Sequence, residues 1–317
     1  MAKGTIEINY DAKTIMKHGY PRIRKTGAVS PNGESTPFVF NGELYRLELE
    51  DRSRGTDPST PVCALIRHRE TGKVISRLAH SCYYQSFYQE NGVAYVIGTK
   101  SEFPRLSGHS YLIFESRDLV NWTERELISR PGWTYYNSSL TKSPDGYVLC
   151  MEAGAPKEAV GDHPFTLFFA TSPDMIHWTF MDDDLGFSKD RYMGGPWLQY
   201  SEGWYYLISV TALPCNHYTN YIYRTQDFVT WYVGLYNPVL MPSDEDKNLS
   251  LYAYDLTPEM IEEIRTGFNI NNSDIDMCDW NGKTIIDYNC GNQLGFYYMC
   301  EAEYDGTMAE LLASYFE

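Results

Sequence analysis

Three histidines of the sequence recur in the same local setting. Each stands in a short loop just before an apolar segment, and each precedes the aspartate of a Ser/Thr-x-Asp-x-x-x-Trp element by 9 to 11 residues. Imidazoles in equivalent positions can coordinate a cation, contact substrate hydroxyls or transfer a proton. Alternatively, they are strand-entry residues that face the solvent. The three candidates, for substrate contact and for a possible divalent-cation site, are His109, His163 and His217.

A second set of candidates consists of carboxylates at the ends of apolar segments. Asp274 and Asp276 stand two residues apart, so that a strand would present both on one face. Glu34 precedes an apolar segment, and Glu152 ends one, where an unpaired carboxylate is costly. Two carboxyls in different environments can act as acid and base across one bond, although each alone could equally be a structural hydrogen-bond acceptor. We take Asp274, Glu152 and Glu34 as candidate catalytic residues and Asp276 as a candidate substrate-binding residue.

The elements that must position these residues follow from an internal repeat. Five segments share an apolar strand pattern, a tight turn ending in glycine and a second strand pattern, with the turn glycines at 42, 92, 146, 203 and 282. Asn-Gly and Asp-Gly turns between apolar alternations are strong hairpin signals, because type I′ turns require positive φ. The first three spacings between these glycines, 50, 54 and 57 residues, suit one four-stranded propeller blade.

Two further patterns complete the predicted architecture. The Ser/Thr-x-Asp-x-x-x-Trp element occurs at residues 116–122, 172–178 and 225–231, and predicts the turn between the third and outer strands of blades two, three and four. Residues 257–265 begin with Thr-Pro and an acidic turn, which predicts an inserted surface helix, and residues 307–312 carry a capping-box pattern of a C-terminal helix. We therefore predict an all-β fold, a single five-bladed β-propeller domain over residues 1–317 with these two helices.

In such a propeller, inner strands begin at the same end of the molecule at which second strands finish. The predicted starts of the inner strands are Glu34, His80, Asn137, Gly195 and Asp274. Glu152 falls at the end of a second strand, and the three histidine loops open on the same face. The site is therefore expected at the mouth of the central channel, with His80 and Asn137 as additional substrate-binding candidates.

Composition excludes several classes of partner. Lys plus Arg number 26 against 42 Asp plus Glu, a net charge of −16 that argues against nucleic acid or an anionic membrane surface as the partner. No segment has the length and apolarity of a membrane span or of a secretory signal. The seven cysteines are odd in number and widely spaced, most of them in apolar strand patterns, so we expect reduced thiols and a cytoplasmic location. Aromatic residues make up 15% of the chain, which suits both strands and sugar-stacking surfaces.

With these hairpins and Trp elements, the chain resembles the five-bladed propeller glycoside hydrolases of family 43 and their sucrose-processing relatives. The resemblance implies hydrolysis of arabinose, xylose or fructose linkages by carboxylates at the blade entrances. Core members open blade one with Asp-Pro, where this chain has Ser35-Thr36-Pro37 with Glu34 before it. Blades two and four open with His80-Ser81 and Gly194-Gly195-Pro196 instead of acids. The family's set of acids is therefore not present intact: either the catalytic roles have moved to Glu34, Glu152 and Asp274, or the chemistry differs.

Three hypotheses remain open on this evidence. The first is a glycoside hydrolase that removes a terminal sugar from an oligo- or polysaccharide, needs no cofactor, and uses Asp274 or Glu34 as base and Glu152 as acid. The second is a lyase or metal-assisted carbohydrate-active enzyme that uses the histidine cluster. The third is a propeller that binds carbohydrate without catalysis.

Overall fold

The computed structural model describes residues 5–8, 19–51, 62–80, 82–101, 106–162, 165–215, 217–292 and 294–317. Nearly all of its regular structure is β-strand, so the predicted all-β class is confirmed. In this part of the chain the strands pair into five antiparallel units of four, which we call blades one to five. Blades four and five are joined into one sheet by a single parallel bridge between Thr219 and Asn272.

Each blade runs outward from the centre of the molecule in the order in which its strands are named here. Blade one contains β3 (Gly33–Phe40), β4 (Glu43–Glu50), β5 (Cys63–His68) and β6 (Val74–Leu78). Blade two contains β7 (Cys82–Glu90), β8 (Val93–Lys100), β9 (Ser110–Ser116) and β10 (Thr123–Ser129). Blade three contains β11 (Thr134–Ser143), β12 (Gly146–Ala155), β13 (Thr166–Ser172) and β14 (Thr179–Phe180). Blade four contains β15 (Met193–Ser201), β16 (Trp204–Leu213), β17 (His217–Thr225) and β18 (Thr230–Val233). Blade five contains β19 (Asn271–Trp280), β20 (Lys283–Gly291), β21 (Tyr297–Tyr304) and β2 (Ile23–Ser30).

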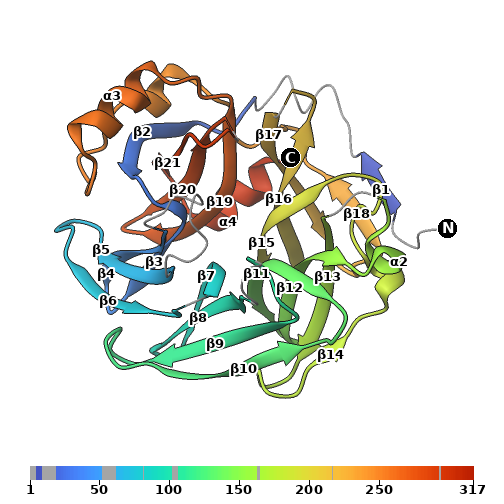
Figure 1. The fold of residues 1–317 in the computed structure, drawn as a ribbon. Helices are drawn as coiled ribbons and strands as arrows, with labels where there is room; N and C mark the ends of the chain where they lie inside the picture. The colour runs from blue at the N-terminus through green and yellow to red at the C-terminus, as the bar shows by residue number, and fades with distance from the viewer. Residues whose placement is uncertain are drawn as a thin grey trace.

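The blades close into a ring around a common centre (Figure 1). Each inner strand contacts the next, from β3 through β7, β11 and β15 to β19, and β19 contacts β3 again. The outer strand of blade five is β2, from the N-terminal part of the chain, which pairs with β21 before the chain enters blade one. The ring is therefore closed by strands from opposite ends of the sequence. A further N-terminal strand, β1 (Thr5–Ile8), lies parallel to β18.

Both sequence repeats form the turns predicted for them. The five turn glycines join the first and second strands of the blades, and each has positive φ. In the Trp elements the aspartate accepts backbone N–H bonds, as Asp118 does from Val120 and Asn121 at 2.9 and 2.8 Å. The tryptophan packs against the preceding blade, and Trp122 donates to Ser76 of β6. The element therefore connects each of these blades to the one before it.

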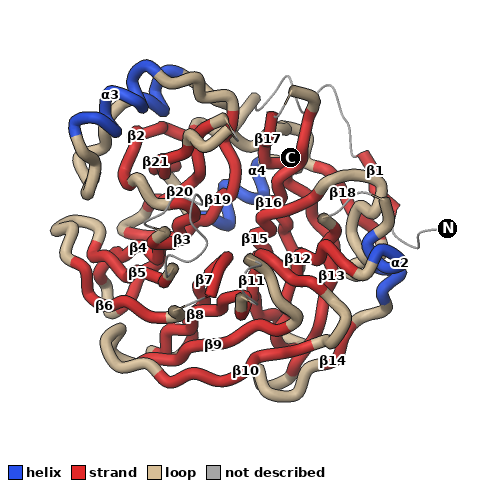
Figure 2. The backbone as a smooth tube through the Cα atoms, viewed as in Figure 1, coloured by secondary structure: helices blue, strands red, loops and turns tan. Residues whose placement is uncertain are grey.

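The helices lie outside the ring or at one of its ends (Figure 2). The predicted insertion forms α3 (Pro258–Thr266), capped by Thr257, and the predicted terminal helix forms α4 (Met308–Ser314) with a capping box from Thr307. Short turns form α2 (Lys157–Val160), η1 (Asp183–Leu185) and η2 (Asp244–Lys247). Within the described residues, no helix has the length and apolar character needed to cross a membrane.

A cavity of about 350 Å³ runs along the axis between the inner strands of all blades. Asp276 lies on its wall, and so does Met308, the first residue of α4. The backbone N–H of Met308 donates to Asp279 of β19 at 2.6 Å, which fixes the helix to the hairpin end of blade five. The C-terminal helix therefore borders the channel at the end opposite to the starts of the inner strands.

Candidate active site

The start of every inner strand carries a β-bulge, and this repeated irregularity defines the site. The pairing of inner and second strands shifts by one residue in each blade, so an extra residue is inserted there. The first residues of the bulges are Glu34, Tyr84, Tyr136, Gly195 and Asp274. All except Tyr136 have a φ between 46° and 56°. Bulges redirect side chains at the rims of closed sheets, and here they bring one residue of each blade to the same end of the channel.

Four carboxyl groups come together at this end of the ring. The pKa of Glu34 is raised well above its ordinary value by burial and then by the charges of Asp274, Glu152 and Asp276. The structure therefore brings together all four carboxylates that the sequence analysis selected. Glu34 lies inside β3, because this strand begins at Gly33, four residues before the apolar pattern that begins at Pro37.

Glu152 occupies β12 directly across from the bulge of blade three and is 2% exposed. Its Oε2 accepts hydrogen bonds from Asn137 Nδ2 at 3.0 Å and from the backbone N–H of Gly195 at 2.8 Å. Burial nevertheless dominates and raises the pKa of Glu152 to about 7. The backbone N–H of Asn137 is a further donor to this carboxyl group. Oε1 lies next to Gly194, and Asn137 is thus a residue that positions Glu152.

Asp274 faces the same glycine pair from blade five. A Cβ on Gly195 would lie 2.4 Å from Asp274 Oδ1, so only glycine admits this approach at a φ of +50°. Ser273 donates to Asp274 Oδ2 at 2.7 Å, which favours the ionised carboxylate. Burial acts in the opposite direction and raises the pKa of Asp274. Glu152 and Asp274 therefore approach the backbone at Gly194 and Gly195 from two sides.

Asp276 lies deeper along the channel axis. It accepts a hydrogen bond from Thr36 of blade one, and burial raises its pKa to about 7. Because of the bulge between Ser273 and Asp276, Asp274 and Asp276 do not follow simple strand alternation. Both nevertheless lie close enough to Glu34 for their charges to raise its pKa. Asp276 therefore connects the carboxyl cluster to the interface between blades five and one.

An arc of aromatic rings borders the carboxyl cluster on blades two to four. Neighbouring ring centroids in this arc lie between 4.3 and 5.6 Å apart, and the rings are those of Tyr84, Tyr136, Phe165, Tyr192 and Tyr218. Burial raises the pKa of Tyr84, and the nearby charges of Glu34 and Glu152 raise it further. Burial also raises the pKa of Tyr192, where the neighbouring charges are those of Glu152 and Asp274. Both phenols are therefore protonated donors beside the carboxylates. Such rings suit the apolar face of a sugar.

The predicted histidines lie at the edge of this arrangement. His80 is exposed and precedes β7 by two residues, whereas Tyr84 occupies the bulge position of blade two. His109 is exposed. Its backbone carbonyl accepts a hydrogen bond from the backbone N–H of Arg130, which lies near the start of β11. His217 is half-buried at the start of β17, whose third residue pairs with Asn272, so it lies at the same end of the ring as Asp274. His163 lies outside the described residues, and the metal site of the three histidines stays a prediction.

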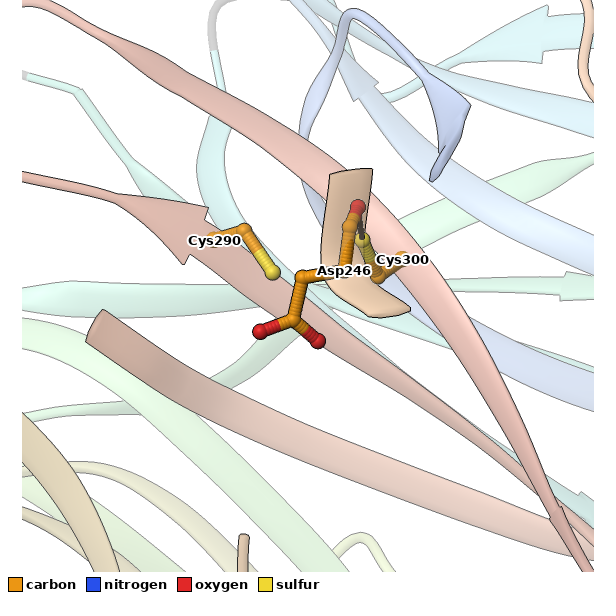
Figure 3. A group of neighbouring side chains, drawn as sticks. All are labelled: Asp246, Cys290 and Cys300. Atoms are coloured by element: carbon orange, nitrogen blue, oxygen red, sulfur yellow. Dashed lines mark hydrogen bonds between the residues drawn. The ribbon is translucent and has the colours of Figure 1, made fainter. Parts of the chain in front are cut away.

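Among the described residues, one group of potential metal ligands is close enough to share an ion, and it is a different one: Asp246, Cys290 and Cys300 (Figure 3). The Asp246 carboxylate is already engaged by Lys25 Nζ at 2.7 Å and by the hydroxyl of Tyr288 at 2.8 Å. Burial raises the pKa of both thiols, and Cys300 Sγ donates to the backbone carbonyl of Asp246 at 3.3 Å. The group is therefore a buried hydrogen-bond network that fastens η2 to blade five.

The sequence analysis named none of the rings of the aromatic arc, and among them Tyr84 also occupies a bulge position. A usable signal was present, because Glu34, Tyr84, Gly195 and Asp274 each precede the turn glycine of their blade by eight residues. The chemistry of histidine favoured His80, although its spacing to Gly92 differs. Register was thus the better guide to position than residue type.

No protein-family model matches the sequence, and no curated protein sequence matches it. Solved structures do match its fold. A structure described as a glycoside hydrolase has a TM-score of 0.66 at 13% identity and covers 95% of this chain and 98% of its own. A glycosyl hydrolase from Bacteroides ovatus has a TM-score of 0.57 at 16% identity, covering 89% and 85% of the two chains. A GH43_1 enzyme from Xanthomonas citri complexed with xylose has a TM-score of 0.53 at 14% identity, covering 92% and 91%. The chain therefore has the β-propeller fold of these glycoside hydrolases.

Proposed function

We propose that this protein is a glycoside hydrolase that removes a terminal sugar from an oligo- or polysaccharide by carboxylate acid–base catalysis. The observation that carries the proposal is the convergence of Glu34, Glu152 and Asp274, from three blades, at one end of the ring. Hydrolysis of a glycosidic bond requires two carboxyl groups in different protonation states. The fold shared with solved glycoside hydrolases, one of them complexed with xylose, supports the same reaction class.

Glu152 is the proposed general acid. Burial raises its pKa to about 7, so a large share of the molecules carry a proton on this group at neutral pH. The donors from Asn137 and Gly195 hold the carboxyl in place. An acid with a pKa near the working pH is the most effective donor to a leaving-group oxygen.

Asp274 is the proposed base or nucleophile. The hydrogen bond from Ser273 favours its ionised form, whereas the pKa of Glu34 is raised well above normal by burial and three acidic neighbours. Glu34 is therefore the group that stays protonated, and it can donate a hydrogen bond to a substrate hydroxyl. The aromatic arc from Tyr84 to Tyr218 would stack on the sugar.

The test is a screen of aryl glycosides and short oligosaccharides with the wild type, Asp274→Asn and Glu152→Gln. On the oligosaccharides, each substitution should lower turnover by about 10²- to 10⁴-fold while the melting temperature stays near that of the wild type. Glu43→Gln, at an exposed position at the hairpin end of blade one, is the matched control and should keep full activity. Cleavage at wild-type rates by both site variants would rule out the proposed roles. Sugar binding without cleavage by any form of the protein would instead identify a non-catalytic carbohydrate-binding propeller.

A further inference from the structure

A second cavity, of about 230 Å³, opens beside the carboxyl cluster within blade five. It lies between the start of β19, the end of β20 and the start of β21, at the same end of the ring as Asp274. Ser273 lines this cavity and also donates to Asp274 Oδ2 at 2.7 Å. One residue therefore connects the cavity to the proposed base.

Two buried amide atoms in the wall of this cavity have no hydrogen-bond partner. They are Nδ2 of Asn271, a residue 2% exposed, and Oδ1 of Asn289. The other amide atom of Asn271, Oδ1, accepts from the backbone N–H of Tyr218 at 2.7 Å, which orients the amide and leaves Nδ2 free. Asn289 pairs with Ser273 in the sheet, and Asn271 stands two residues before Ser273, so the three side chains share one face. Buried polar atoms in native proteins are normally paired, so a polar molecule is expected between them.

The lining of the cavity defines the chemistry of that molecule. It offers an unpaired donor and an unpaired acceptor, and none of the described side chains that line it is charged. Phe296 and Tyr297 add aromatic surface to the amides. A sugar hydroxyl both donates and accepts a hydrogen bond, and the C–H face of a sugar ring packs on aromatic rings. A neutral sugar unit satisfies every one of these features, whereas an anionic or cationic group would find no counter-charge.

We propose that this cavity is a subsite for a second, neutral sugar unit of the substrate, next to the unit attacked at Asp274. The proposal rests on the proposed glycosidase function and extends it from a single terminal sugar to recognition of at least two units. Asn289 and Asn271 would determine specificity by binding hydroxyls of this second unit. Neither would take part in the reaction itself.

The test compares binding of one sugar unit with binding of three by calorimetry, in a Glu152→Gln background that prevents turnover. The probes are xylose and xylotriose, arabinose and arabinotriose, and fructose and kestose. Asn289→Leu removes the acceptor at similar size and should weaken trisaccharide binding by about tenfold, leaving the monosaccharide unchanged. Asn289→Asp keeps an acceptor oxygen and should keep trisaccharide binding within about threefold of the parent. Asn121→Leu, the same change in an exposed turn of blade two, is the control and should have no effect.

Equal affinities of Asn289→Leu and its parent for every trisaccharide would overturn the subsite, since the cavity would then hold only water. Failure of all six probes to bind would overturn it as well. The proposed hydrolysis can fail separately: if the wild type cleaves none of these glycosides but binds a trisaccharide in an Asn289-dependent manner, the subsite stands and the catalytic proposal falls.

Discussion

At the scale of single residues, burial distinguishes the carboxyl cluster from the acidic surface of this protein. Exposed aspartates such as Asp118 are ordinary hydrogen-bond acceptors. The pKa of Asp118 is lowered by hydrogen bonds from the backbone and the side chain of Asn121. In Glu152 and Asp276 the loss of water outweighs the bound donors, and the pKa of each rises to about 7. The same residue types thus serve as turn caps at the rim and as titratable acids at the centre.

The first prediction concerns the pH profile of activity. If Glu152 is the acid, kcat/KM should fall as pH rises above about 7, because the required proton is then lost. Asp274 must be ionised for activity. Because its pKa is raised, activity on the acid side should fall at a higher pH than it would with an ordinary aspartate as the base. With a nitrophenyl glycoside, whose leaving group needs no proton, Glu152→Gln should keep measurable activity and lose the alkaline limb. An unchanged alkaline limb in this variant would assign the limb to another group.

The second prediction concerns the pH dependence of stability. Glu152 and Asp276 keep their protons in the folded state up to about pH 7, whereas the unfolded chain releases them near the ordinary values of 4.5 and 3.8. The unfolded state therefore binds fewer protons between these limits, and stability falls as pH rises from about 4.5 to 7. The double variant Glu152→Gln/Asp276→Asn should show a smaller decrease in melting temperature between pH 5 and pH 8. Equal decreases in both proteins would mean that neither carboxyl holds its proton in the folded state.

How far single residues could be predicted depends on what fixes them. Glu34, Glu152, Asp274 and Asp276 could be grouped from the sequence because strand ends converge in any propeller, and they lie at one end of the ring. Asn137 was expected there as a substrate-binding residue, but its hydrogen bond to Glu152 and that of Gly195 could not be predicted, because they form only through the bulges of two different blades. Tyr84 was missed because residue type does not separate a site tyrosine in a strand from a core one; only its spacing of eight residues to Gly92 marks it.

At the scale of elements, the repeated bulges direct one residue of each inner strand toward the same site. A non-glycine residue with positive φ is strained, and strain of this kind is retained where the surrounding structure enforces it. Here it recurs at Glu34, Tyr84 and Asp274. The hairpin turns could be predicted because Asn-Gly has a local signature, but the bulges could not, because their backbone conformation is imposed by the ring and not by residue type. Among the bulge residues with positive φ, only Gly195 is of a type that favours this backbone conformation.

The third prediction tests this close approach with two glycines that both have positive φ. Gly195→Ala places a methyl group 2.4 Å from Asp274 Oδ1 and should displace the proposed base, lowering kcat by at least about tenfold. Gly203→Ala, in the hairpin of the same blade at a φ of +85°, meets no atom within 4 Å. Both variants should lose roughly 1 kcal/mol of stability from the left-handed conformation, but only Gly195→Ala should lose activity. Equal activities would show that Asp274 does not need its present position.

At the scale of the whole molecule, the five interfaces between blades are not alike. Apolar clusters fill the interfaces of blades one and two, two and three, three and four, and four and five. Between blades five and one a buried ionic network connects Arg46, Arg69, Glu301 and Asp287. The apolar interfaces follow from strand patterns that can be read in the sequence. The ionic interface cannot be predicted from the sequence, because Arg46 and Glu301 are 255 residues apart and no local pattern marks them as partners.

The last prediction tests whether this ionic network holds the ring closed. Glu301 is fully buried and binds Arg69 at 3.0 and 2.5 Å as well as Arg46, and although burial opposes its charge, the two guanidinium groups lower its pKa. Glu301→Gln removes the shared negative charge and leaves both arginines buried without it, which should cost about 3–5 kcal/mol. For a domain of this size the melting temperature should fall by roughly 10 °C. Glu262→Gln breaks an exposed pair with Arg265 on α3 and should change the melting temperature by no more than about 2 °C. If the two variants melt at the same temperature, the ionic contact is incidental, and the ring is held closed by the other contacts of blades five and one, such as that of Thr36 with Asp276, together with the pairing of β2 with β21.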